Sequence, residues 1–401
     1  MISGFYRLSV AERRLRLLRD DFDENDLNHL CGTIDDETAQ LDLMSENVVG
    51  ALRLPMGILT GLLVNGTEHI VPMATEEPSV VAAVNRTARL INAAGGIKTE
   101  VMRPVTTAQI MLVADGLDAE MLKARIIADK SMWLLLANRC DEKLIQLGGG
   151  AFDLDAEVLP GNETWAETFV VTRIHVHTLD AMGANIVNTM AECILREMVK
   201  KYQSEPVFAT IEPGMAILTN MSLGRMVTAS ALIPFEVISA FGGTDGEAFA
   251  HLIARSSAFA TRSPERAITH NKGILNGMIA AALAFGQDTR ALGSAALAYA
   301  CHREHRPLAS WSIEAQGLCG QIALPVVAGF VGGAQACPQY RAALRLSRID
   351  SYHTLCSVLA GVGLAQNLGA LWALSTDGIQ AGHMKLHRRK EAERKTAPEA
   401  L

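Results

Sequence analysis

The sequence has few aromatic side chains, no excess of basic charge and no long uninterrupted apolar run. Aromatic residues make up only 5% of the 401 positions although 49% are hydrophobic, so Ala, Leu, Val and Gly must fill most of the core. A formal net charge of −7 argues against a nucleic-acid partner, which requires a basic face. The most apolar stretch, residues 322–337, is interrupted by Pro and Gly and is shorter than the ~20 residues of a membrane helix, so we expect no membrane span.

The sequence also lacks paired cysteine motifs, an apolar stretch within residues 1–21 and the usual dinucleotide fingerprint. Its seven cysteines are scattered without CxxC spacing, and residues 1–21 carry five arginines and no apolar core. We therefore expect reduced thiols, no signal peptide and a cytoplasmic location. The nearest approach to G-x-G-x-x-G, at residues 361–366, lacks the third Gly and lies in an apolar helical run, which favours core packing.

Local signals predict both helices and strands. Ser9 and Glu12 have capping-box spacing, with a helix expected to run through residue 18. Residues 58–64 and 68–75 are typical of strands, and Asn65-Gly66 between them predicts a hairpin turn because both residues tolerate positive φ. A helix from Pro78 to about residue 94 should stop at Gly95-Gly96.

A central block, residues 105–221, has the size and pattern of an inserted α/β domain. It shows a strand near its start, a long helical stretch at 119–146, a strand at 168–177 and a helix at 184–202. From residue 222 onward the pattern is mostly helical.

These patterns predict a mixed fold, α+β with an α/β insertion. Residues 1–104 and 222–372 would form a large, mostly helical domain around the smaller one at 105–221. Residues 373–401 would form a short C-terminal flap.

Four short polar strings stand out from this background. Each places a charged or titratable side chain beside a Gly or Pro, or a Gly where a backbone must come close to a ligand. They are Thr75-Glu76-Glu77-Pro78-Ser79, Asp180-Ala181-Met182-Gly183-Ala184-Asn185, Thr269-His270-Asn271-Lys272-Gly273 and Gly382-His383-Met384.

Two of the strings carry side chains suited to carbonyl chemistry. Glu77 lies beside Glu76 at a strand-to-helix junction, where burial and a like charge would favour a proton donor near neutral pH. Two solvated acids near a helix N-terminus would look the same. Lys272, flanked by small and polar residues, predicts a partly buried turn in which a fixed ammonium stabilises an oxyanion. Most lysines, however, are ordinary surface residues.

Asp288 and His383 complete a candidate titrating cluster. Alone, Asp288 is typical of a helix N-cap, but beside Lys272 and Glu77 it would titrate together with them. His383 could protonate a leaving thiolate near neutral pH. Its spacing to His387 resembles a zinc helix, but the sequence has neither the required Glu nor an obvious third ligand, so we expect no metal.

The remaining string predicts a phosphate site or a plain turn. Gly183 would let the backbone approach a pyrophosphate at the N-terminus of the following helix. The alternative is an ordinary strand-to-helix turn capped by Asp180.

In this order the four strings resemble 3-hydroxy-3-methylglutaryl-CoA (HMG-CoA) reductase in its bacterial class II form, from about residue 5 to residue 389. The resemblance implies interconversion of HMG-CoA with mevalonate and CoA by two hydride transfers from or to a nicotinamide cofactor. It assigns acid catalysis to Glu77, oxyanion stabilisation to Lys272, a catalytic carboxylate to Asp288 and protonation of the CoA thiolate to His383.

The resemblance also implies ligand contacts. The positions matched for the substrate or catalytic centre are Ser79, Asn220, Arg266 and Asn276, and those for the dinucleotide are Asp180, Met182, Gly183 and Asn185. Arg266 suits the free carboxylate of the substrate because guanidinium pairs bidentately with carboxylates. Asp141 aligns with an acidic residue of NAD-using members, and a carboxylate repels a ribose 2′-phosphate, so NAD is favoured over NADP.

Two alternatives stay open at this point. The same site could use NADPH in the biosynthetic direction, or a non-redox acyl-CoA-binding protein could have the same fold. Dependence on a nicotinamide cofactor separates them. The resemblance further implies a homodimer or an assembly of dimers, with a shorter C-terminal flap than in many class II relatives.

Overall fold

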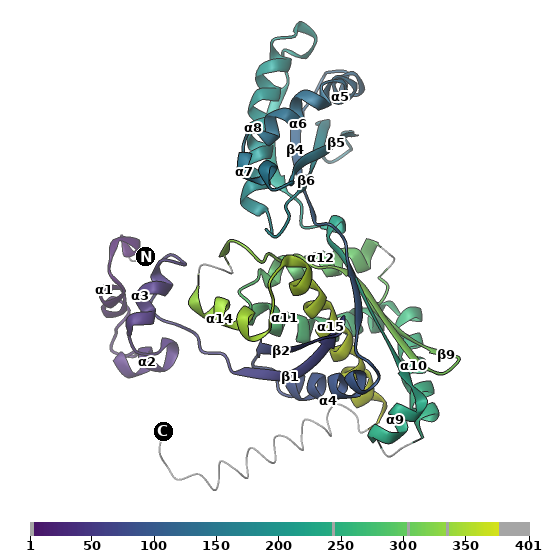
Figure 1. The fold of residues 1–401 in the computed structure, drawn as a ribbon. Helices are drawn as coiled ribbons and strands as arrows, with labels where there is room; N and C mark the ends of the chain where they lie inside the picture. Colours follow the sequence, from purple (N-terminus) through teal and green to yellow (C-terminus); the bar gives the residue numbers. More distant parts are fainter. Residues whose placement is uncertain (1–3, 243–244, 303–304, 334–336, 377–401) are drawn as a thin grey trace. The chain divides into compact units, whose positions relative to one another are not determined.

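The computed structural model describes residues 4–242, 245–302, 305–333 and 337–376 (Figure 1). The chain divides into two compact units, residues 1–55 and 56–401. Helices and antiparallel sheets alternate along it, as the predicted mixed fold class requires.

The N-terminal unit consists of short helices held by a buried arginine. The predicted capping box of Ser9 and Glu12 is present, but the helix ends earlier than predicted. The Arg14 guanidinium donates to the carbonyls of Gly32 and Val49, both at 2.9 Å, and so joins the helices to the chain that follows them. The elements are η1 (Phe5–Arg7), α1 (Val10–Leu15), α2 (Glu24–Cys31) and α3 (Asp36–Asp42).

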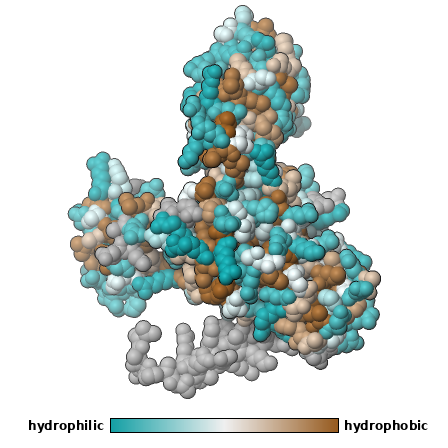
Figure 2. Space-filling view, in the orientation of Figure 1, coloured by the Kyte–Doolittle hydropathy of each residue, from teal (hydrophilic) through white to brown (hydrophobic). Residues whose placement is uncertain are grey.

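Some apolar side chains of this unit reach the surface. Leu43 is 90% exposed and Leu52 is 81% exposed. Apolar and polar residues are interleaved across the visible face of the molecule (Figure 2). Scattered apolar residues are ordinary on protein surfaces, so these carry no argument about a partner.

The second unit begins with the predicted hairpin. Strands β1 (Met56–Val64) and β2 (Thr67–Ala74) pair antiparallel, and Asn65 and Gly66 have φ values of 48° and 80° at the turn. Helix α4 (Val80–Ala93) follows and stops before Gly95, as predicted.

A four-stranded antiparallel sheet lies in the region predicted to be mostly helical. Its strand order is β3-β8-β10-β9. The prediction was wrong here because these strands are rich in small residues that fit either structure, and their pairing partners are distant in the chain. The strands are β3 (Lys98–Val101), β8 (Met226–Pro234), β9 (Ala309–Glu314) and β10 (Gly317–Pro325).

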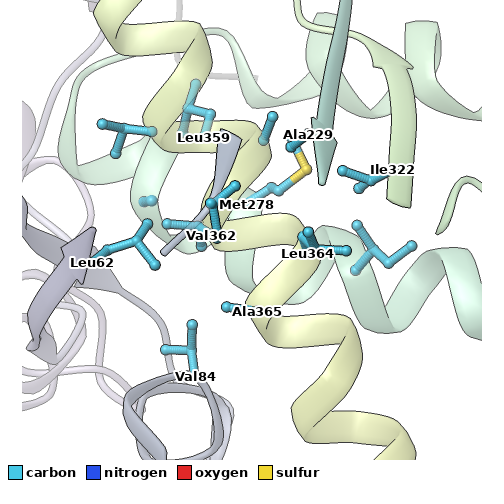
Figure 3. Packing of buried hydrophobic residues seen from close by; sticks show 14 of the residues in the cluster. Leu62, Val84, Ala229, Met278, Ile322, Leu359, Val362, Leu364 and Ala365 are labelled. Atoms are coloured by element: carbon cyan, nitrogen blue, oxygen red, sulfur yellow. The ribbon is translucent and has the colours of Figure 1, made fainter. Parts of the chain in front are cut away.

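Helix α15 (Tyr352–Ser375) is the centre of the larger hydrophobic core. It is long and apolar enough to cross a membrane, but 89% of its most apolar window is buried inside the protein. Figure 3 shows Leu359 and Val362 of this helix among Leu62, Val84 and Met278, which come from a strand and two other helices. The other helices of this part are α9 (Phe235–Gly242), α10 (Gly246–Arg262), α11 (Pro264–Ala284), α12 (Thr289–His302) and α14 (Pro338–Leu346).

A second antiparallel sheet, with strand order β5-β6-β4-β7, has its own hydrophobic core. Residues of β4 alternate between buried and half-buried positions, because helices cover only one face of the sheet. Trp133 and Tyr202 meet edge to face within this core, with ring centroids 5.9 Å apart. The elements are β4 (Val105–Val113), α5 (Ala119–Ala128), α6 (Lys130–Asn138), α7 (Glu142–Gln146), β5 (Gly150–Leu159), β6 (Phe169–His177), α8 (Ala184–Gln203) and β7 (Glu212–Leu218).

One helix prediction in this part needs correction. The stretch 119–146 is three helices, because the chain breaks at Asp129 and again before Asp141. The Asp141 side chain caps α7, whereas Asp129 makes no side-chain cap hydrogen bond to α6. The domain bounds proposed from the sequence stay a prediction.

Candidate active site

Glu77, Lys272 and Asn276 form one hydrogen-bonded group between the end of β2 and the middle of α11. Lys272 Nζ lies 3.0 Å from Glu77 Oε2, and Asn276 Nδ2 donates to Glu77 Oε1 at 3.0 Å. Lys272 and Asn276 are one helical turn apart, so they project from the same face of α11. The fold thus brings together two strings that the sequence places far apart.

The surroundings of this group differ from the sequence-based expectation. The side chains of Lys272 and Glu77 are 63% and 38% exposed, and Lys272 stands within a continuous helix rather than in a partly buried turn. The nearest charged group to Glu77 is the ammonium of Lys272, whereas Glu76 is exposed.

Ser79 lies next to this group in an unusual conformation. It occupies the N-cap of α4 rather than the predicted first turn, with φ 75° and ψ −15°, a left-handed conformation that is uncommon outside glycine. Its hydroxyl makes no cap hydrogen bond, and Oγ is buried without a partner among the described residues. An orphaned buried hydroxyl beside a charged cluster is available to a ligand.

Small residues fix the helix that carries Lys272. An added Cβ at Gly277 would lie 2.8 Å from Gln366 Cγ, so α11 approaches α15 more closely than a larger residue would allow. On the other side of α15, Gly369 meets Ala83 of α4, and Thr87 Oγ1 donates to the Ala365 carbonyl at 2.7 Å. These contacts hold α4 and α11 in place around α15, which positions Ser79 relative to Lys272.

A buried polar network beneath Lys272 was not predicted from the sequence. His270 Nε2 lies 3.0 Å from both the Ala309 carbonyl and Asn367 Nδ2, and Trp311 Nε1 donates to Asn367 Oδ1 at 2.9 Å. Burial, together with the nearby Arg266 guanidinium, lowers the pKa of His270 to about 4. His270 is therefore neutral at physiological pH and supports α11 as a hydrogen-bonding residue.

Arg266 lies in the first turn of α11, and its guanidinium is half-buried. Its backbone N–H donates to Ser263 Oγ, which caps the helix. Burial lowers the pKa of Arg266, and the guanidinium has no hydrogen-bond or ion-pair partner among the described residues. A half-buried cation without an acceptor suits a carboxylate ligand.

Asp288 makes no hydrogen bond or ion pair to the group in the described structure. Asp288 Oδ1 accepts the N–H groups of Arg290 and Ala291, both at 3.0 Å, so it caps α12. Its polar partners within the described ranges all lie on that helix, and the predicted coupling to Lys272 and Glu77 stays a prediction. His383 lies outside the described residues.

The predicted dinucleotide string is a turn bound on several sides. Asp180 Oδ1 accepts the Tyr352 N–H at 2.7 Å, at the start of α15, instead of capping α8. Gly183 is the N-cap of α8, with φ 88°, and an added Cβ there would lie 2.3 Å from Thr178 Cγ2. The Met182 carbonyl accepts from Arg225 Nη2 at 2.6 Å. A glycine is thus required at this turn both by its conformation and by the lack of space.

The other predicted contacts lie around the second sheet. Asp141 is the N-cap of α7, where Oδ1 accepts the Leu144 N–H at 2.8 Å. Asn185 is exposed in the first turn of α8, and Asn220 is exposed in the loop after β7. Neither exposed asparagine side chain has a hydrogen-bond partner among the described residues, so both are open to solvent or ligand.

A metal centre has no candidate in the described part of the chain. Nowhere in the described ranges do three His, Cys, Asp or Glu side chains converge in a way that could hold an ion.

The chain is similar to known proteins over nearly its whole length. The model of the hydroxymethylglutaryl-coenzyme A reductase family matches residues 9–388, which include every candidate site residue. The chain belongs to this family. The reductase of Archaeoglobus fulgidus is 35% identical over 403 residues, covering 98% of this chain and 86% of the relative. A probable reductase of Borreliella burgdorferi is 31% identical, covering 86% of this chain and 77% of the relative.

Solved structures agree with the sequence relatives. The class II HMG-CoA reductase of Streptococcus pneumoniae, described as bound to NADPH in open conformations, superposes with a TM-score of 0.78 at 33% identity, over 93% of this chain and 99% of that one. A second structure of the Streptococcus enzyme has a TM-score of 0.78 at 34% identity, over 99% of this chain and 92% of that one. The predicted class II HMG-CoA reductase family and mixed fold are confirmed.

The family defines the reaction. This protein interconverts HMG-CoA with mevalonate and CoA by two hydride transfers. The relatives named above are reductases, so the non-redox alternative has no support from them.

Proposed function

We propose that Glu77 and Lys272 form the reaction centre at which this HMG-CoA reductase acts, and that a nicotinamide dinucleotide binds at the turn before α8. The observation that carries the proposal is the contact of Lys272 Nζ with Glu77 Oε2 at 3.0 Å. An ammonium and a carboxylate that contact each other and are partly exposed to solvent can bind a carbonyl oxygen and exchange a proton with it.

Lys272 stabilises the oxygen of the substrate carbonyl. Its side chain is 63% exposed, so the ammonium can turn from Glu77 towards a bound thioester. Negative charge develops on the carbonyl oxygen in both reduction steps, and a cation in contact with that oxygen lowers the energy of that state. Glu77, oriented by Asn276, handles the proton at the aldehyde stage.

Ser79 and Arg266 bind the acyl part of the substrate. The buried, unpartnered hydroxyl of Ser79 and the unpartnered guanidinium of Arg266 both gain an acceptor or donor when the ligand binds. Asp288 and His383 keep the roles that the motif match gives them, as a catalytic carboxylate and as the acid that protonates the CoA thiolate.

The turn from Asp180 to Gly183 suits the diphosphate of the cofactor. In the described structure the N–H groups of Gly183 and of the first turn of α8 donate to no protein acceptor, so they can bind an anion at this helix N-terminus. Asn185 is exposed beside this turn. The bound dinucleotide supplies or accepts the hydride.

Asp141 favours NAD. A carboxylate at this position accepts hydrogen bonds from a ribose 2′-OH and repels a 2′-phosphate. NADP is the second candidate, because the related Streptococcus pneumoniae enzyme is described as bound to NADPH. We further propose a homodimer or an assembly of dimers, and a cytoplasmic location.

The test is the nicotinamide absorbance of purified protein with mevalonate and CoA, run in parallel with NAD and NADP, and in reverse with HMG-CoA and each reduced cofactor. Reduction of NAD alone supports the whole proposal. Reduction of NADP alone keeps the reaction but removes the role of Asp141. No reaction with either cofactor in either direction, from folded protein, would contradict the proposed site.

A further inference from the structure

Arg225 is a buried cation without an acidic partner. It ends the short helix η3 (Leu223–Arg225) and is 1% exposed. No ion pair to Arg225 occurs in the described part of the chain, and its face-on neighbour is the Tyr352 ring, with the centroid 5.2 Å from Cζ. A buried, unneutralised charge is costly, so its retention calls for a role beyond packing.

The Arg225 guanidinium instead binds neutral oxygens in and around the turn before α8. Nη2 donates to the carbonyls of Ala181 at 2.9 Å and Met182 at 2.6 Å. It also donates to the hydroxyls of Thr106 and Thr178, and Nη1 donates to the Ala328 carbonyl at 3.1 Å. One side chain therefore joins the start of β4, the end of β6 and the turn before α8.

These contacts set the direction of two peptide groups. The structure contains no cis peptide bond among its described residues, and a trans peptide holds its N–H opposite its C=O. Because the carbonyls of Ala181 and Met182 point at Arg225, the N–H groups of Met182 and Gly183 point away from it. Thr106 Oγ1 also donates to the Met182 carbonyl at 3.0 Å, which further restrains the second peptide.

We infer that Arg225 is the positioning residue for the diphosphate of the cofactor, an inference that rests on the proposed function. It fixes the second peptide group so that the Gly183 N–H, which has no acceptor in the described structure, points away from the guanidinium, and it places an uncompensated positive charge behind the turn. Both effects favour an anion at the N-terminus of α8. Arg225 contacts neither Lys272 nor Glu77 in the described structure, so its effect should be confined to the cofactor.

Two variants separate geometry from charge. Arg225→Lys keeps the charge but loses the fork that reaches five acceptors, and Arg225→Gln loses the charge. We expect the Kd of ADP-ribose, which contains the diphosphate, to rise by about tenfold or more in each variant. A change of this size corresponds in free energy to the loss of about one charge-assisted hydrogen bond. The KM of the reduced cofactor should rise with it, while the KM of HMG-CoA should change by less than about twofold.

The matched control is Arg173→Lys, the same exchange on β6, where Arg173 binds Asp155 at 2.7 Å and Glu157 at 2.9 Å away from the turn. It should leave ADP-ribose binding unchanged. Ile110→Ala, in the core of the same sheet, calibrates the effect of lost stability alone. If the Arg225 variants do not fold, Thr178→Val removes one acceptor of the guanidinium and should raise the Kd of ADP-ribose by a smaller factor.

The outcomes are distinct. Unchanged ADP-ribose affinity in folded Arg225 or Thr178 variants overturns the inference and leaves the proposed function standing. An equal rise in the KM of both substrates, matching that of Ile110→Ala, also overturns it, since the residue would then be structural only. Failure of the wild-type full chain to bind ADP-ribose, NADH or NADPH overturns the inference together with the proposed cofactor site.

Discussion

Lys272 Nζ lies 3.0 Å from Glu77 Oε2, and Asn276 holds the other oxygen of the same carboxylate at 3.0 Å. The three side chains come from two elements, α11 and the turn after β2, whose relative position is set by close packing around α15. Any change in that packing therefore acts on the distance between the two charges.

Lys272→Ala should lower kcat by about a hundredfold to a thousandfold, the loss expected when one oxyanion donor is removed. Its side chain is 63% exposed, so the free energy of unfolding should stay within about 0.5 kcal/mol of the wild type. Steady-state kinetics and urea unfolding measure the two quantities. Lys200→Ala is the control, because Lys200 is 70% exposed and pairs with Glu197 at 2.7 Å on α8. Near-normal turnover of Lys272→Ala would remove the lysine from the mechanism.

Asp141→Ser should shift cofactor use towards NADP. Serine keeps the N-cap of α7 but removes the charge that repels a 2′-phosphate, so the ratio of kcat/KM for NADP to that for NAD should rise by about tenfold. The neighbouring variant Glu142→Gln removes a charge from the same helix without touching the cap, and should change the ratio little. Equal NADP-to-NAD ratios of kcat/KM in the two variants would mean that Asp141 does not discriminate between the two cofactors at the ribose.

Gly277→Ala should destabilise the protein by about 1–3 kcal/mol, because its Cβ would lie 2.8 Å from Gln366 Cγ in a closely packed interface. Gly273→Ala, one turn earlier on the same helix, meets only Ala370 Cβ at 3.8 Å. It should be neutral or stabilising by up to about 1 kcal/mol through helix propensity. Urea unfolding of both variants gives the comparison, and similar stability of the two would contradict the close approach of α11 to α15.

His270 should make the protein less stable as the pH falls. Its pKa is lowered to about 4 in the folded state by burial, whereas the unfolded imidazole keeps its ordinary value of about 6.5. Between these values the unfolded state binds the proton, so the contribution is complete above pH ~6.5 and is lost as the pH falls towards 4, on the order of 3 kcal/mol in total.

Chemical unfolding at several pH values tests this dependence. His270→Gln should lower stability at neutral pH but give a flatter curve between pH 6.5 and 4. His251→Gln on α10, an exposed histidine, should keep the wild-type slope. Parallel curves for all three proteins would show that His270 does not titrate in this range.

Local rules predicted the parts of the fold that local chemistry decides. Asn65-Gly66 forms the expected hairpin, and Gly95 follows the end of α4, because positive φ is a property of the residue and its turn. Glu77 and Lys272 meet as the motifs indicated. The strands β8 and β10 were missed, since pairing across long sequence separations decides strand structure there.

Arg225 and His270 show where prediction from sequence stops. The oxygens that bind Arg225 belong to residues as distant as Thr106 and Ala328, so no local pattern marks the arginine. His270 lies within a recognised string, but its burial depends on Asn367 of α15. The roles of Arg225 and His270 both depend on tertiary contacts, and no residue spacing in the sequence predicts those contacts.

The place of α15 in the chain determines the order in which the two cores are completed during synthesis. All buried residues of the second core lie between Ala108 and Ile211, so that core can close while the ribosome is still making the rest. The first core begins at Leu59 but has α15, Tyr352–Ser375, at its centre. Its apolar faces stay uncovered until this last helix emerges, so the second core is completed first, and the newly made first core is the part that most needs protection from aggregation.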